Sequence, residues 1–120
     1  MAEKKSMVVI AGSDALENIY KAFIMATVGG GMGADVTMFF TMSGLNAVKK
    51  GGAEKINMPG APALTELLQQ AKDLGIHLVA CSLAMSVLGI KEEDLIDGVK
   101  PVGAATALDH AFNVDLTLSF

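Results

Sequence analysis

Residues 76–88 read IHLVACSLAMSVL, and this stretch decides how the chain folds. Its first part, residues 76–80, is a largely apolar run of the kind that forms a strand buried on both faces. Its second part, residues 82–88, has the apolar spacing of a helix. Cys81, the only cysteine of the chain, stands between the two parts. The sequence therefore predicts that this thiol lies where a strand ends and a helix begins.

The same alternation of strand and helix patterns recurs on both sides of this stretch. Strands are expected at residues 7–11, 35–41, 76–80, 99–102 and 114–120, and helices at residues 15–28, 43–48, 62–74, 82–88 and 104–111. Strands that alternate with helices predict βαβ units with right-handed crossovers, and these units build a mainly parallel sheet. We therefore expect an α/β fold, with one domain over residues 1–120.

Composition and charge narrow the classes of protein that fit this chain. Hydrophobic residues make up 52% and charged residues 18% of its 120 residues, which is typical of a packed domain and not of a disordered chain. So much apolar surface favours a homo-oligomer that covers part of it. The net charge of −4 argues against a nucleic-acid partner. A lone cysteine cannot form an internal disulfide, which favours the reducing cytoplasm.

No stable membrane insertion is expected from the apolar segments. Residues 7–12 form an apolar run that is too short for a secretory leader. Residues 74–90 are an uncharged window close to the length of a membrane span. This window contains His77, two serines and a glycine near each end, so a strand followed by a helix describes it better.

Three loops are candidates for a binding site, because sites in open parallel sheets lie beyond the carboxyl ends of the strands. The loops begin at Gly12, Thr41 and Cys81, each after an expected strand. The candidate residues are Cys81 for chemistry and Gly12, Ser13, Asp14, Thr41, Ser43 and Ser82 for ligand binding. Asp14 also has the position of a helix N-cap, with Glu17 three residues later, and the two roles are compatible.

The sequence predicts neither a metal site nor a cofactor. His77 and Cys81 share a face of the expected strand, but four residues of strand separate them by about 13 Å. His77 is therefore expected to be a core or edge histidine, and His110 to face solvent. One cysteine and two scattered histidines provide no set of metal ligands. The glycine-rich residues 29–33 follow a helix and precede no lysine, which excludes a phosphate-binding loop.

Three segments of the chain resemble the DsrE/DsrF-like family, and most closely its subgroup of DsrE-type sulfur carriers, also labelled peroxiredoxin-family proteins. These segments are residues 39–45 (FFTMSGL), 80–90 (ACSLAMSVLGI) and 115–120 (DLTLSF). The resemblance implies a three-layer α/β/α sandwich with a mainly parallel five-stranded sheet, assembled as a trimer or hexamer. It also implies that Cys81 carries persulfide sulfur between a donor protein and an acceptor protein.

The leading hypothesis from the sequence is a cytoplasmic sulfur-relay protein that carries persulfide sulfur on Cys81. With no second cysteine, the chain cannot form a resolving disulfide with itself, so sulfur would leave to another molecule. Whether this makes the protein a sulfurtransferase or only a carrier stays open. A second hypothesis is an oligomeric module that binds a small ligand or nucleotide, in which Cys81 only lines the pocket. A third is an oligomeric adaptor with a buried, unreactive Cys81.

Overall fold

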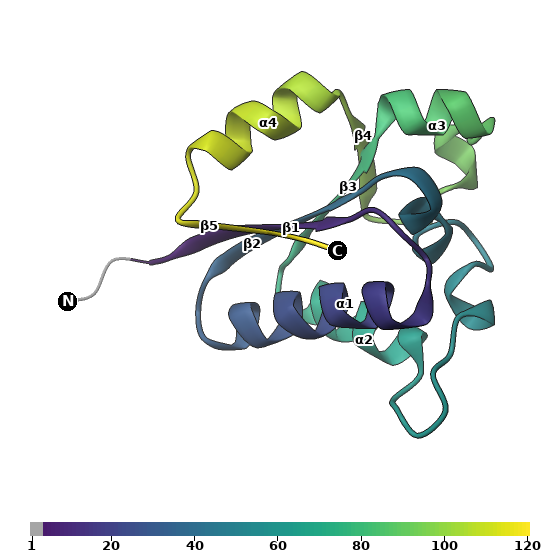
Figure 1. The fold of residues 1–120 in the computed structure, drawn as a ribbon, viewed down its shortest axis with the longest axis horizontal. Helices are drawn as coiled ribbons and strands as arrows, with labels where there is room; N and C mark the ends of the chain where they lie inside the picture. Colours follow the sequence, from purple (N-terminus) through teal and green to yellow (C-terminus); the bar gives the residue numbers. More distant parts are fainter. Residues whose placement is uncertain (1–3) are drawn as a thin grey trace.

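The structure is a computed structural model that describes residues 4–120; residues 1–3 of the expected domain lie outside the described part. A five-stranded sheet forms its centre, and every strand pairs in parallel with its neighbours. The strands are β1 (Ser6–Ala11), β2 (Asp35–Phe40), β3 (His77–Cys81), β4 (Val99–Val102) and β5 (Leu116–Ser119). Their order across the sheet is β4-β3-β2-β1-β5 (Figure 1). The expected α/β fold is confirmed.

Helices lie on both sides of the sheet, as expected for a three-layer sandwich. They are α1 (Leu16–Gly31), α2 (Leu64–Asp73), α3 (Ser82–Leu88) and α4 (Ala104–Phe112), with short 3-10 segments η1 (Met42–Ala47), η2 (Ala53–Lys55) and η3 (Glu92–Asp94). Helices α1 and α2 lie together on one face, whereas α3 and α4 lie on the other (Figure 1). Helix α3 follows directly on the carboxyl end of β3, at the edge of the sheet where the candidate loops are expected.

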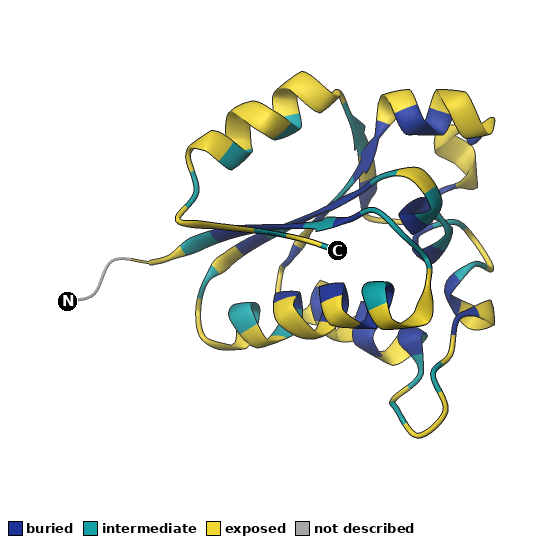
Figure 2. Ribbon diagram, viewed as in Figure 1, coloured by how far each residue is buried: buried dark blue, intermediate teal, exposed yellow. Residues whose placement is uncertain are grey.

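The core lies between the sheet and the pair of helices α1 and α2. Alternate residues of each strand point to this face, and on β2 these include Met38 and Phe40, which have no exposed surface. The ring of Phe40 packs against Phe23 of α1 with centroids 5.8 Å apart. Figure 2 shows the inward sides of α1 and α2 as buried and their outward sides as exposed. The core therefore fixes β1, β2 and β3 relative to one another.

The opposite face of the sheet is covered much less completely. Helix α4 lies over it, yet none of the residues of α4 is buried (Figure 2). The sheet residues beneath α4 include Val8 and Phe39, which are themselves buried. The two layers of helices are thus packed to very different degrees.

The beginning of α1 differs from the sequence expectation. Ala15 occupies the N-cap position and no side chain caps the helix, so the prediction that Asp14 is the N-cap is wrong. The carboxylate of Asp14 instead accepts a hydrogen bond from Nδ2 of Asn46, 2.9 Å away. A tertiary partner has replaced the local capping bond that the sequence pattern favours.

The window at residues 74–90 contains β3 followed by α3, as expected. Within the part of the chain that the structure describes, no helix has both the length and the apolar character needed to cross a membrane.

Candidate functional site at the carboxyl edge of the sheet

Cys81 is both the last residue of β3 and the N-cap of α3, which confirms the position predicted for it. Its backbone is extended, with φ −68° and ψ 113°. The first backbone N–H groups of a helix have no partner within the helix, and they favour negative charge nearby. A cysteine thiolate, the nucleophilic form, is such a charge. The side chain is only 5% exposed, so this thiol is sheltered from solvent.

The loops that follow β1 and β2 are joined by hydrogen bonds. The backbone N–H of Thr41 donates to the carbonyl of Ala11 at 3.0 Å, which extends the pairing of the two strands by one residue. The backbone N–H of Asp14 donates to Oγ of Ser43 at 3.2 Å. Together with the bond from Asn46 to Asp14, these contacts hold Ser13, Asp14, Thr41 and Ser43 in one cluster.

Gly44 allows these two loops to approach each other closely. A Cβ atom at this position would lie 2.0 Å from the carbonyl oxygen of Ala11 and 3.2 Å from the backbone nitrogen of Ser13. Real Cβ atoms do not come that close to backbone, so only glycine fits here without a shift of one loop. Gly44 is therefore a structural requirement of the cluster.

Gly12 connects the cluster to the last residue of the sequence. Its backbone N–H donates to the carbonyl of Phe120 at 2.8 Å, and the N–H of Phe120 donates to the carbonyl of Ile10 at 2.9 Å. The ammonium group of Lys21 lies 5.9 Å from the centroid of the Phe120 ring. Strand β5 thus brings the end of the chain to the same edge of the sheet as the candidate loops.

The third candidate loop lies next to the cluster but is less tightly tied to it. Phe40 of β2 pairs with Ala80 of β3 in the sheet. Thr41 and Cys81 are the residues that directly follow this pair, so they lie at neighbouring strand ends. Helix α3 also packs against η1, which contains Ser43. Ser82 is exposed at the first position of α3. The structure therefore brings five of the candidate residues into direct contact or near it, with Cys81 and Ser82 on the adjacent strand end.

Hydroxyl groups give the cluster its capacity to bind a ligand. Oγ of Ser13 accepts a bond from the backbone N–H of Ala15 at 3.1 Å, and Oγ of Ser43 accepts from Asp14. A hydroxyl that accepts one bond still has its own hydrogen to donate. Both serines can therefore donate to an anionic or polar group placed at this edge.

Comparison with known proteins assigns the chain to a family. A sequence model of the DsrE/DsrF/DrsH-like family matches residues 3–60 and 52–119, which together span nearly all of the chain. The chain belongs to this family. The match confirms the resemblance that the segments around Thr41 and Cys81 indicate.

Two relatives are similar to this chain in sequence. The sulfur carrier protein DsrE2 of Allochromatium vinosum is 23% identical over 156 aligned residues, covering 97% of this chain and 98% of that protein. An uncharacterised protein of Methanocaldococcus jannaschii is 30% identical over 99 residues, covering 82% of this chain. The present chain spans only 36% of the length of that archaeal protein.

Solved structures show the same fold at lower identity. The YchN protein of Escherichia coli superposes with a TM-score of 0.77 at 17% identity, over 97% of this chain and 99% of the other. A protein of unknown function from Methanobacterium thermoautotrophicum superposes with a TM-score of 0.76 at 12% identity, over 98% and 100%. These likenesses confirm the fold of this DsrE/DsrF/DrsH-like chain.

Met42 lies in the second candidate loop but was not among the residues predicted to bind a ligand. Its φ of +49° lies in the left-handed region, which a residue with a side chain seldom adopts. Its side chain is 49% exposed. Backbone strain of this kind gathers at functional sites, where the surrounding structure enforces it. Nothing in the local sequence signals the strain, because it arises where η1 is drawn against β1.

The two histidines lie away from Cys81. His77 was expected to be a core or edge histidine, but it is an exposed residue at the start of the inner strand β3, and its Nε2 lies 3.2 Å from Oδ1 of Asp35. His110 is exposed as expected, but its Nε2 also lies 3.3 Å from Oγ1 of Thr37. Among residues 4–120, no three side chains of the His, Cys, Asp and Glu types come together as a metal site.

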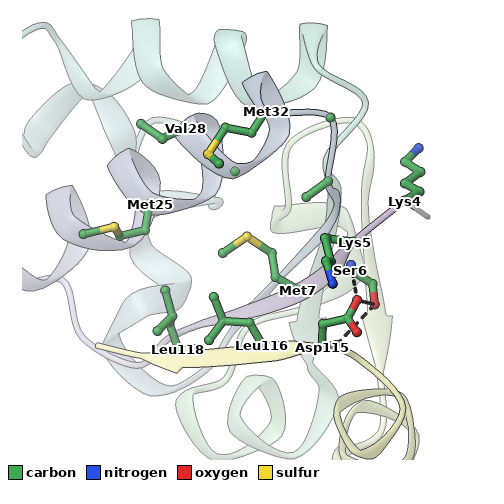
Figure 3. A pocket seen from close by; sticks show the side chains of 13 residues that line it. Lys4, Lys5, Ser6, Met7, Met25, Val28, Met32, Asp115, Leu116 and Leu118 are labelled. Carbon is green, nitrogen blue, oxygen red and sulfur yellow. Dashed lines mark hydrogen bonds between the residues drawn. The ribbon is translucent and has the colours of Figure 1, made fainter. Parts of the chain in front are cut away.

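A large cavity lies away from the Cys81 edge. It is a groove of about 790 Å³ between the outward side of α1 and strands β1 and β5. Figure 3 shows Met25 and Val28 of α1, and Met32 directly after this helix, facing Leu116 and Leu118 of β5. Its lining includes Lys4, Lys5 and Ser6 at the start of β1, at the opposite end of the sheet from Cys81. This groove is therefore no part of the candidate site.

A polar clasp closes one end of this groove. The carboxylate of Asp115 accepts bonds from the backbone N–H and the hydroxyl of Ser6, at 2.9 and 3.2 Å (Figure 3). The backbone bond from Ser6 is the main reason that the pKa of Asp115 lies below its usual value, with smaller help from the Ser6 hydroxyl and the charge of Lys5. The clasp holds the start of β5 against the start of β1.

Proposed function

We propose that this protein is a cytoplasmic sulfur-relay protein that carries persulfide sulfur on Cys81 and passes it to partner proteins. The observation that carries the proposal is the placement of the single cysteine at the junction of β3 and α3. Membership of the DsrE/DsrF/DrsH-like family and similarity to the sulfur carrier DsrE2 support sulfur transfer as the chemistry of this cysteine.

The transfer needs one thiol and no change of net oxidation state. The Cys81 thiolate would attack the outer sulfur of a donor persulfide, forming a new S–S bond while the bond to the donor breaks. The donor leaves as a thiolate, and the outer sulfur now belongs to Cys81. An acceptor thiolate repeats the step in the other direction. The chain would therefore act only as a carrier, because the donor supplies the transferred sulfur and the acceptor supplies the thiolate that removes it.

The low exposure of Cys81 suits a carrier that must keep its cargo. A persulfide that is 5% exposed would be protected from thiols in solution. Loading then requires a partner or a small displacement of α3. This helix has only seven residues, and the side chains of Leu83 and Val87 are mostly exposed on it. An exposed apolar surface beside the thiol supports docking of donor and acceptor proteins.

The same reasoning supports the expected homo-oligomer, proposed as a trimer or hexamer. Exposed large apolar side chains occur on α1, α3, α4 and β5: Leu16, Ile24, Met25, Val28, Met32, Leu83, Val87, Leu88, Leu108, Phe112 and Leu116. A soluble monomer seldom leaves this much apolar surface uncovered. Contacts between copies of the chain would cover part of it.

Mass spectrometry of the intact protein tests the assignment of Cys81. After treatment with a small persulfide donor, the protein should gain the mass of one sulfur atom, about 32 Da, and lose it on reduction. The Cys81→Ser variant should gain nothing. A desulfurase that carries a persulfide on its own cysteine should load the wild type in the same way.

A relocated cysteine separates the position of the thiol from its mere presence. Ser86 is exposed on α3, so Cys81→Ser combined with Ser86→Cys places the only thiol on the same helix away from its start. We expect this variant to be alkylated faster than the wild type but to pass less sulfur to an acceptor thiol protein. Equal delivery by the two proteins, or no loading of the wild type, would contradict the proposal.

The burial of Cys81 is also compatible with the other two hypotheses, in which it only lines a binding pocket or is an unreactive residue of an adaptor. The pocket hypothesis has its own test. In that case the cluster of Ser13, Asp14, Thr41 and Ser43 would bind a small ligand or nucleotide without covalent chemistry. A thermal shift caused by such a ligand should then persist in Cys81→Ala. A shift that disappears in this variant, together with sulfur loading of the wild type, favours the carrier.

A further inference from the structure

A second cavity, of about 320 Å³, lies between α4 and the sheet. It is lined by Val8, Asp35, Thr37, Phe39, His77, Val79, Val102, Thr106, Ala107 and His110. Its volume equals that of about ten molecules of liquid water, which is space for a small organic molecule. Five of the ten lining residues have polar side chains, but most of the lining surface is apolar, as it is in the groove beside α1.

The polar and apolar residues of this cavity are separated along the strands. Asp35 and His77 are the first residues of β2 and β3, and Thr37 pairs with His77 in the sheet. Phe39 and Val79 form the next pair of the same two strands, on the same face. The cavity therefore has a polar end at the starts of the strands and an apolar end farther along them.

Hydrogen bonds at the polar end leave acceptors unused. Nε2 of His77 lies 3.2 Å from Oδ1 of Asp35, so this contact occupies only one of the two carboxylate oxygens. The other carboxylate oxygen of Asp35 is an acceptor. Lys100 is the sheet partner of Val79, but it is not among the residues that line the cavity. The polar end thus offers acceptors and one negative charge.

Helix α4 is held over this cavity by few contacts. None of its residues is buried, and its polar contact with the sheet is the 3.3 Å approach of His110 to Thr37. Ala107, the half-buried residue of α4 that lines the cavity, has too short a side chain to fill the space beneath the helix. A bound molecule would supply the packing that α4 lacks in the isolated chain.

We infer that this cavity binds a small organic amine, with its ammonium group at the carboxylate of Asp35 and its apolar part against Phe39, Val79 and Val102. The ammonium group matches the polar end in both hydrogen bonding and charge, because it has only donors and carries a positive charge. The inference is independent of the chemistry at Cys81.

The probe for this site is 2-phenylethylamine, and its matched control is 3-phenylpropionate, which has a carboxylate in place of the ammonium group. Titration followed by amide chemical shifts should give a Kd on the order of 1 mM for the amine, as expected for a molecule of this size. The shifts should concentrate at Thr37, Val79, Val102 and Ala107. The carboxylate should cause no saturable shifts there.

Two substitutions test the two ends of the cavity. Asp35→Asn should weaken binding of the amine by about fivefold or more, because it removes the charge. Ala107→Phe should fill the apolar end from the exposed helix and abolish binding, whereas Ala105→Phe, on an exposed residue of the same helix, should leave the Kd unchanged. Equal binding of the carboxylate, unchanged binding by Ala107→Phe, or shifts confined to residues outside the cavity would overturn the inference.

Discussion

At the scale of single residues, Gly44 has the clearest consequence. A side chain at this position would overlap the backbone of Ala11, which cannot move without disturbing β1. We predict that Gly44→Ala lowers the free energy of unfolding by about 2–3 kcal/mol, the upper range for overpacking. Chemical denaturation would measure the loss. Because Gly44 also joins the loops after β1 and β2, sulfur loading of Cys81 should slow in the same variant.

Gly31 provides a matched control for this substitution. It lies at the end of α1, and an added Cβ would meet no atom within 4 Å. Gly31→Ala should leave stability unchanged or raise it by about 0.5 kcal/mol, since alanine favours the helix. Similar losses in the two alanine variants would show that the close approach at Gly44 is not the cause.

The lowered pKa of Asp115 predicts that the stability of the fold depends on pH. Its pKa is lower in the folded protein than its usual 3.8, mainly through the backbone N–H of Ser6. The ionised clasp therefore stabilises the fold above that value, and its contribution is lost as pH falls through the lowered pKa. Asp115→Asn should unfold at a lower temperature than the wild type at pH 7. The two melting temperatures should converge as the pH falls through the lowered pKa of Asp115, because its side chain then loses its charge. A difference in melting temperature that stays constant as the pH falls would show that the hydrogen bonds between Asp115 and Ser6 are not its cause.

At the scale of elements, α4 is expected to be the least stable helix. Stability against local opening follows the burial of an element, and α4 buries no residue whereas α1 buries five. We predict that amides of α4 exchange with deuterium at least about tenfold faster than those in the middle of α1. Hydrogen-exchange mass spectrometry can measure both in one experiment. Protection of α4 equal to that of α1 at low protein concentration would contradict this expectation.

The elements themselves could be predicted well from the sequence. The strand at residues 99–102 and the helix at residues 82–88 have the expected bounds, and the alternation of patterns sufficed to predict the parallel sheet. Local patterns succeed here because burial on both faces produces continuous apolar runs. One exception was the end of the first helix, which was expected at residue 28 but continues through Gly31. Another was Asp14, where a pattern typical of an N-cap competed with a partner 32 residues away. Contacts at such distances have no signature in one sequence.

The candidate site was predictable in its location but not in its detail. The loops after β1 and β2 meet at the predicted edge, because parallel strands end together. The left-handed backbone of Met42 and the burial of Cys81 were not predictable, since both depend on how η1 and α3 pack. The cavity beneath α4 could not be predicted from the sequence either. The sequence separates His77 from His110 by more than thirty residues, and only the fold brings their surroundings together.

At the scale of the whole molecule, the exposed apolar surface predicts self-association. Met32 and Phe112 are each 82% exposed, on opposite sides of the sheet. We expect sedimentation of the wild type to show a trimer or hexamer. Val28→Glu combined with Met32→Glu, or Phe112→Glu alone, should shift it toward smaller species, depending on which side forms the contact. Each buried apolar side chain contributes roughly 1.5–3 kcal/mol to such a contact. A wild type that sediments as a monomer at all concentrations would contradict the expectation.

The bond between Gly12 and Phe120 has a practical consequence for work with this protein. Phe120 ends beside the loop after β1, so anything attached to it emerges next to the candidate site. A group attached there would lie at the same edge of the sheet as the β3–α3 junction. The strands run in parallel, and β1 begins at the far end of the sheet from that junction. A label meant to leave the candidate site undisturbed therefore belongs near the start of β1, and a label meant to sense that site belongs at Phe120.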